Sequence, residues 1–133
     1  MLGIFFIACS SGELTAFPSS LDWGEIDFRE ATPEGGFDQE DISLTNTGTQ
    51  NINISLSAFD DTHLCLTGLE GKPQELGTLE PEQSYALRVG VCDYVEEDGE
   101  RDTLISGQIE ITHTGANSPV YINWSFTPII VIE

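Results

Sequence analysis

The sequence predicts a single all-β sandwich domain. Apolar and polar residues alternate with a period of two along most of the chain, as in Ile52, Ile54 and Leu56, which is typical of strands with one face in a core. Clusters rich in Gly, Pro, Asn and Asp separate these runs and indicate turns. No run of useful length has helical periodicity. A chain of 133 residues has the length of one domain.

The first four predicted strands are 13–17, 20–28, 38–46 and 50–58. Pro18 is expected to divide the first of these from the second, because proline cannot donate to a strand ladder. A bulge is expected at Gly24-Glu25, because the inward face shifts by one residue between Trp23 and Ile26. Turn signals at 32–36 and 46–48 separate the later strands of this group.

The remaining predicted strands are 62–67, 74–79, 84–93, 104–113 and 119–131. Alternation is clearest at 85–91 and 120–126, where every second residue is apolar or aromatic. Turn signals lie at 68–73, 80–82, 96–99 and 115–117. Short strands between such turns predict a sandwich or barrel.

The charge of the chain is strongly negative and limits its partners. There are 23 Asp and Glu residues against 4 Lys and Arg, which gives a formal net charge of -19. Nucleic-acid binding needs basic residues to neutralise phosphates, so this class is excluded, and anionic lipid headgroups are disfavoured. Three interpretations of the acidity stay open: solubility through self-repulsion, binding of a divalent cation, and recognition of a basic partner.

The N-terminal segment predicts export. Residues 1–9 read MLGIFFIAC, an apolar run too short to span a membrane and similar to the end of a secretory signal. The end of this run, FIAC, resembles a bacterial lipoprotein box, which implies lipidation of Cys9 and, with Ser10 next, delivery to the outer membrane or surface of a Gram-negative cell. The expected organisation is a signal-like segment 1–9, a tether 10–13 and one domain 14–133. A short apolar N-terminal strand is the alternative.

The cysteine count agrees with this interpretation. The chain has three cysteines, and assigning Cys9 to a lipid leaves Cys65 and Cys92. In an oxidising compartment these two are expected to form a disulfide, which would stabilise the fold by about 3 kcal/mol. Two separate buried thiols are the alternative.

Four segments together resemble a known family. They are 21–25 (LDWGE), 42–48 (ISLTNTG), 79–84 (LEPEQS) and 107–111 (GQIEI). Their order and spacing over residues 14–127 are similar to ASH-type (abnormal spindle and hydin) immunoglobulin-like domains and to choice-of-anchor modules of bacterial surface proteins. The resemblance implies an immunoglobulin-like antiparallel β-sandwich of seven to nine strands that serves adhesion, scaffolding or protein contact. It implies protein partners in the cell envelope and no catalytic residues.

The sequence contains no recognisable catalytic motif. Nucleophilic catalysis needs Ser or Cys beside His and an acid, and the only histidines are His63 and His113. His63 follows Asp60-Asp61-Thr62 and is expected either to join these residues at a strand start or to be an exposed strand histidine. No Cys and His spacing suggests zinc. The prediction is a protein that is not an enzyme.

The acidic loop 93–102 is the candidate metal site. Clustered carboxylates on a loop suit Ca²⁺, which takes six to eight oxygen ligands, although the spacing is not that of an EF-hand. Asp60-Asp61 would add ligands if both loops lie at one end of the sandwich. The alternative is a solvated hairpin tip that blocks edge pairing. The candidate calcium ligands are Asp93, Glu96, Asp98, Glu100 and Asp102.

Two functions follow from these observations. The first is a lipid-anchored interaction module of the cell envelope without a cofactor. The second is a calcium-dependent carbohydrate-binding or adhesion domain that uses the acidic loop.

Overall fold

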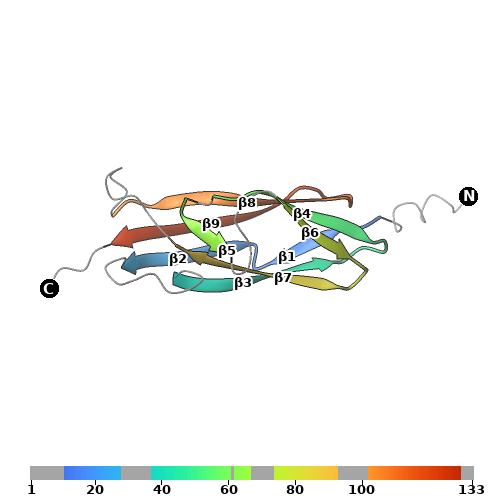
Figure 1. Cartoon of the computed structure of the whole chain (residues 1–133), viewed down its shortest axis with the longest axis horizontal. Coiled ribbons are helices and arrows are strands. Elements are labelled where there is room, and N and C mark those ends of the chain that lie inside the picture. Colours follow the sequence, from blue (N-terminus) through green and yellow to red (C-terminus); the bar gives the residue numbers. More distant parts are fainter. Residues whose placement is uncertain (1–10, 28–36, 61, 67–73, 93–101, 130–133) are drawn as a thin grey trace, which may run out of the picture.

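A computed structural model describes residues 11–27, 37–60, 62–66, 74–92 and 102–129. Within them the regular structure is entirely β, and two sheets pack face to face (Figure 1). One sheet has the strand order β1-β3-β7-β5 and the other β2-β9-β8-β4-β6. The described part contains no helix long and apolar enough to cross a membrane. The strands are β1 Leu14–Phe17, β2 Ser20–Asp27, β3 Phe37–Asn46, β4 Ile52–Ala58, β5 Leu64–Leu66, β6 Gln74–Leu79, β7 Ser84–Val91, β8 Ile105–His113 and β9 Val120–Ile129.

All nine predicted strands are present, and each begins within two residues of its predicted start. The alternation is the reason, because it separates a buried from an exposed face. In β9, for example, Ile122, Trp124 and Phe126 are buried, whereas Tyr121 and Asn123 are exposed. The inward residues of both sheets form one apolar core.

The division of the first segment at Pro18 is confirmed. β1 pairs antiparallel with β3, whereas β2, after the Phe17–Pro18–Ser19 step, pairs with β9 in the other sheet. The chain changes sheet without reversing direction, so β2 and β9 run parallel, as their arrows in Figure 1 show. Every other pair among the described strands is antiparallel.

The predicted bulge in β2 is also confirmed. The register with β9 shifts between Asp22 and Glu25. Gly24 lies at the shift with a φ of 65°, a conformation that glycine adopts without a Cβ penalty. The carboxylate of Asp22 accepts the N–H of Gly24 at 3.1 Å and closes the turn of the bulge.

Asn46, at the end of β3, joins two turns at one end of the sandwich. Its side chain is 0% exposed. Its Nδ2 group donates to the carbonyl oxygens of Gln50 (2.8 Å) and Leu79 (2.9 Å), and its Oδ1 accepts the N–H of Gly48 (2.9 Å). Its own carbonyl accepts the N–H of Glu82 at 2.7 Å. The β3–β4 turn and the β6–β7 turn are therefore tied to one buried amide.

Candidate functional site

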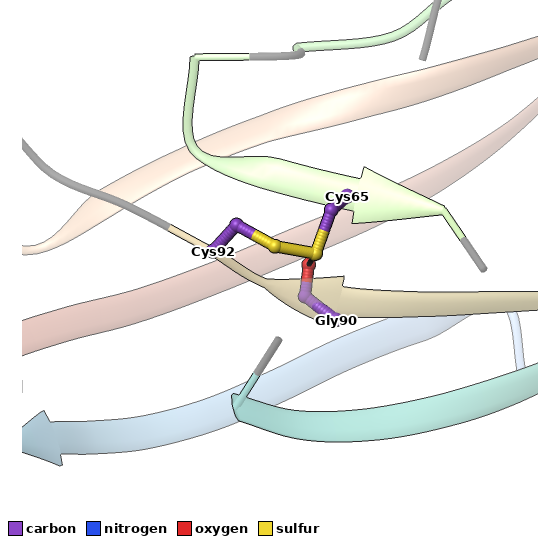
Figure 2. The surroundings of a disulfide bond; sticks show 3 residues. All are labelled: Cys65, Gly90 and Cys92. Atoms are coloured by element: carbon purple, nitrogen blue, oxygen red, sulfur yellow. Dashed lines mark hydrogen bonds between the residues drawn. A yellow bond between two sulfur atoms is a disulfide. The ribbon is translucent and has the colours of Figure 1, made fainter. Parts of the chain in front are cut away.

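The predicted disulfide between Cys65 and Cys92 is present, at the end of the sandwich where β7 ends (Figure 2). It joins edge strand β5 to the residue after β7 across a Cα–Cα distance of 5.7 Å. The Sγ atom of Cys65 lies 3.7 Å from the carbonyl oxygen of Gly90. The N–H of Cys92 donates to the carbonyl of His63 at 2.7 Å. The bridge thus holds the short strand β5 against β7.

His63 and Asp60 form a pair in the β4–β5 connection beside this disulfide. The Nδ1 atom of His63 lies 2.8 Å from one carboxylate oxygen of Asp60, and the other accepts the N–H of Thr62 at 2.9 Å. Partial burial acts to raise the pKa of Asp60, but the hydrogen bonds from His63 and Thr62 hold it below its ordinary value. The imidazole lies 6.1 Å from the Trp124 ring and 5.9 Å from the Phe126 ring, between centroids.

This geometry decides between the two expectations for His63. The side chain is only 12% exposed, so the expectation of an exposed strand histidine is wrong. The expectation that His63 lies with Asp60 is confirmed. The pair caps the turn that leads into β5 and covers the end of the aromatic core.

The acidic loop lies almost entirely outside the described residues. Asp93, Glu96, Asp98 and Glu100 fall there, whereas Asp102 is exposed and donates its N–H to the carbonyl of Pro128 at 2.7 Å. Among the described residues, no three His, Cys, Asp or Glu side chains are grouped to hold a metal ion. The calcium site therefore stays a prediction.

His113 occupies the opposite end of the sandwich, at the end of β8. It is 8% exposed, and its Nδ1 accepts the N–H of Gly115 at 2.9 Å. Burial, the largest influence, lowers the pKa of the imidazole, although Asn117 and Glu13 act in the opposite direction. The neutral imidazole is consequently part of the folded structure.

Protonation of His113 is expected to destabilise the fold. Because the folded pKa lies below the unfolded value of about 6.5, the unfolded chain binds more protons as the pH falls through that value. The free energy of unfolding should be independent of this group above pH 6.5 and fall as the pH is lowered from 6.5 toward 5. Urea unfolding across pH 5–8 should show this slope in the wild type and a shallower one in His113→Asn, whose amide oxygen can still accept the Gly115 N–H. Equal slopes would contradict the assignment.

The described surface carries an open hollow that the sequence did not predict. It occupies about 470 Å³ on the outer face of strands β2, β9 and β8. Six of the residues that line it carry polar side chains, and we call this feature the polar hollow: Ser20, Asp22, Ser106, Gln108, Asn123 and Ser125. Leu21, Gly107 and Trp124 complete the lining, and carbon atoms make up most of its exposed surface.

Strand register creates the polar hollow by stacking these side chains into two rows. Asn123 pairs with Ser20 on one side and Gln108 on the other, and the second row is Asp22, Ser125 and Ser106. The backbone beneath belongs partly to Gly107, whose inward side lies against the Trp124 indole. A Cβ built on Gly107 would approach that ring to 2.7 Å.

The sequence signal for this hollow is weak. Its members come from three strands far apart in the chain, and each is an ordinary outward residue of an alternating strand. Only the parallel pairing of β2 with β9 aligns Ser20 and Asp22 with the rows of β8 and β9.

Comparison with known proteins supports the fold. No protein-family model and no curated protein sequence matches the chain. Among solved structures it is similar to a protein of unknown function from Porphyromonas gingivalis W83, with 16% identity and a TM-score of 0.60, over 90% of this chain and 48% of that one. It is also similar to the ASH/PapD-like domain 7 of human CEP192, with 12% identity and a TM-score of 0.56, over 92% and 89% of the two chains.

A third similar structure is the periplasmic chaperone SfaE, with 9% identity and a TM-score of 0.55, over 90% of this chain and 61% of that one. The chain thus spans about half the length of the P. gingivalis protein. At these identities the likenesses establish the fold. The predicted immunoglobulin-like β-sandwich fold is confirmed, and it is similar to that of an ASH/PapD-like domain.

Proposed function

We propose that this chain is an exported, non-catalytic immunoglobulin-like module that makes protein contacts in the cell envelope and is held at the membrane by a lipid on Cys9. The observation that carries the proposal is the disulfide between Cys65 and Cys92. Disulfides persist in oxidising compartments and are rare in the cytosol. With two of the three cysteines paired, Cys9 is left in the FIAC segment that resembles a lipoprotein box.

The contact function is supported by the fold and by the charge. ASH/PapD-like domains and a periplasmic chaperone share the fold of this chain, although fold alone does not assign a function. A net charge of -19 favours a partner with a basic surface, because complementary charge speeds encounter and excludes acidic competitors. A partner in the envelope that presents Lys and Arg is therefore expected.

Replacing Cys9 with serine is expected to release the protein from the membrane. The thioether to the lipid needs the cysteine sulfur. Within the described part of the chain, backbone hydrogen bonds tie Ser11, Gly12 and Glu13 to the sandwich, so the expected tether is part of the fold there. Cys9 precedes these residues, and folding should be unchanged by its substitution. Expression with an upstream signal in a Gram-negative host, followed by membrane fractionation and intact mass, checks this outcome. The wild type should carry a diacyl or triacyl mass increment and pellet with membranes, whereas Cys9→Ser should be soluble.

The matched control is the double variant Cys65→Ser, Cys92→Ser. It removes the other two cysteines and should still pellet with membranes. An unmodified mass that starts at Met1, or unchanged fractionation of Cys9→Ser, would overturn the anchoring proposal.

A further inference from the structure

We propose that the polar hollow on the outer face of β2, β9 and β8 is a binding site for a neutral oligosaccharide. The inference is independent of the lipid anchor and of the protein partner proposed above. It rests on the hydrogen-bonding groups that line the hollow, on an exposed tyrosine beside it, and on the charge of the surface around it.

The lining offers donors and acceptors suited to sugar hydroxyl groups. Gln108 Nε2 donates to Asn123 Oδ1 at 2.9 Å. This bond orients both amides, and it leaves the Asn123 Nδ2 donors and the Gln108 Oε1 acceptor available to a ligand in the hollow that both residues line. No side-chain hydrogen bond within the described part of the chain uses the hydroxyls of Ser20, Ser106 or Ser125. A ligand rich in hydroxyl groups can accept hydrogen bonds from the donors in the lining and donate hydrogen bonds to the acceptors there.

Tyr121 supplies an aromatic surface next to the hollow. It lies two residues before Asn123 on the same outward face of β9 and pairs across the sheet with Glu110. Hydrogen bonding to the Glu110 carboxylate raises the pKa of the Tyr121 hydroxyl and holds that end of the side chain. The residue is 46% exposed, so part of its ring is open to a ligand. Aromatic rings present a flat apolar face, and the C–H groups of a pyranose ring pack on such a face.

The dimensions fit a short linear sugar chain. Tyr121 to Ser125 spans about 13 Å along β9, and the three strands are about 10 Å across. The volume of about 470 Å³ lies within the range of about 300–1,000 Å³ typical of small-molecule sites.

Charge selects a neutral ligand over an anionic one. Arg88 is the only Lys or Arg among the described residues, and it lies in the other sheet, where its guanidinium bonds Asp41 at 2.8 and 3.1 Å. The hollow itself contains the Asp22 carboxylate. A sulfated or sialylated sugar would therefore meet repulsion from Asp22, and no Lys or Arg among the described residues of these three strands offsets it.

The test uses the full chain with Cys9→Ser on an array of neutral, sialylated and sulfated oligosaccharides. Native gels cast with soluble xyloglucan, galactomannan, β-glucan or dextran give a second readout. We expect binding to at least one neutral glycan. Ser106→Phe, which fills the hollow from an exposed position, and Tyr121→Ala should each weaken this binding about tenfold or more. Tyr121→Phe should retain most of it, because the ring is kept.

Ser43→Phe is the matched control, because it adds the same side chain at an exposed position of β3 in the opposite sheet. It should bind like the parent, and circular dichroism should show that all variants are folded. The proposal is overturned if no neutral glycan binds, if only acidic glycans bind, or if Ser106→Phe binds as well as Ser43→Phe. None of these results bears on the lipid anchor, which is tested by mass and fractionation.

Discussion

Replacing Asn46 with aspartate is expected to lower the free energy of unfolding by about 3 kcal/mol or more. The Nδ2 group of Asn46 donates to two carbonyl oxygens, those of Gln50 and Leu79. An aspartate would place a carboxylate oxygen against both, in a site that is 0% exposed. The lost donors leave the carbonyls unpaired, and the new charge cannot reach water.

Equilibrium unfolding in urea measures this effect, and Asn51→Asp is the matched control. Asn51 is exposed and lies in the same turn region. Asn51→Asp therefore adds the same charge where water can solvate it, and it should change the free energy of unfolding by less than about 0.5 kcal/mol. Asn46→Ala should also be destabilising, because it removes the same donors without adding a charge. If Asn46→Asp were as stable as Asn51→Asp, the role of Asn46 in tying the two turns would be wrong.

The Asn46 bonds show what the sequence can and cannot predict. Segment 42–48 predicted a strand that ends in a turn at this residue, and the structure confirms it. The burial of the side chain depends on Leu79, 33 residues away, whose carbonyl reaches Asn46 only after β6 has paired with β4. Local pattern locates the turn, but the pairing of distant strands decides what the amide contacts.

The same distinction between local pattern and distant pairing applies to the residues of the polar hollow and to the Asp60–His63 pair. Alternation over 120–126 placed Asn123 on an outward face correctly, because a period of two can be recognised without knowing which strands are neighbours. The convergence of Asn123, Ser106 and Asp22 in the polar hollow depends on strand order and register, and the alternation specifies neither of these. The contact of Asp60 with His63 was one of two alternatives that the sequence left open. It needs only a turn, because the residues are three apart, but whether the imidazole is buried depends on its packing near Trp124 and Phe126.

The disulfide is the long-range contact that the sequence did predict, because cysteine chemistry limits the choices. Three cysteines, one of them in a lipobox-like segment, leave one pair. No strand register enters that argument. The number of cysteines could not predict which elements the bridge connects. The structure shows that it links β5, an edge strand of three residues (Leu64–Leu66), to the end of β7.

Removing this bridge is expected to lower the free energy of unfolding by about 3 kcal/mol. The cysteines are 27 residues apart, and the cross-link restricts the unfolded chain over that loop. In Cys9→Ser protein, the double variant Cys65→Ser, Cys92→Ser should unfold at lower guanidinium concentration with a cooperative transition. The parent chain reduced with a phosphine should unfold like the double variant, which separates loss of the bond from the effect of the serines.

Hydrogen exchange should locate the change. β5 is an edge strand that pairs only with β7 among the described strands, so its backbone amides should lose protection first when the bridge is absent. Amides of β8 and β9, in the centre of the other sheet, should lose protection only to the extent that global stability falls. If the bridge were removed without a change in stability or in β5 exchange, the disulfide would have no structural role. The argument for an oxidising compartment would then rest on the N-terminal segment alone.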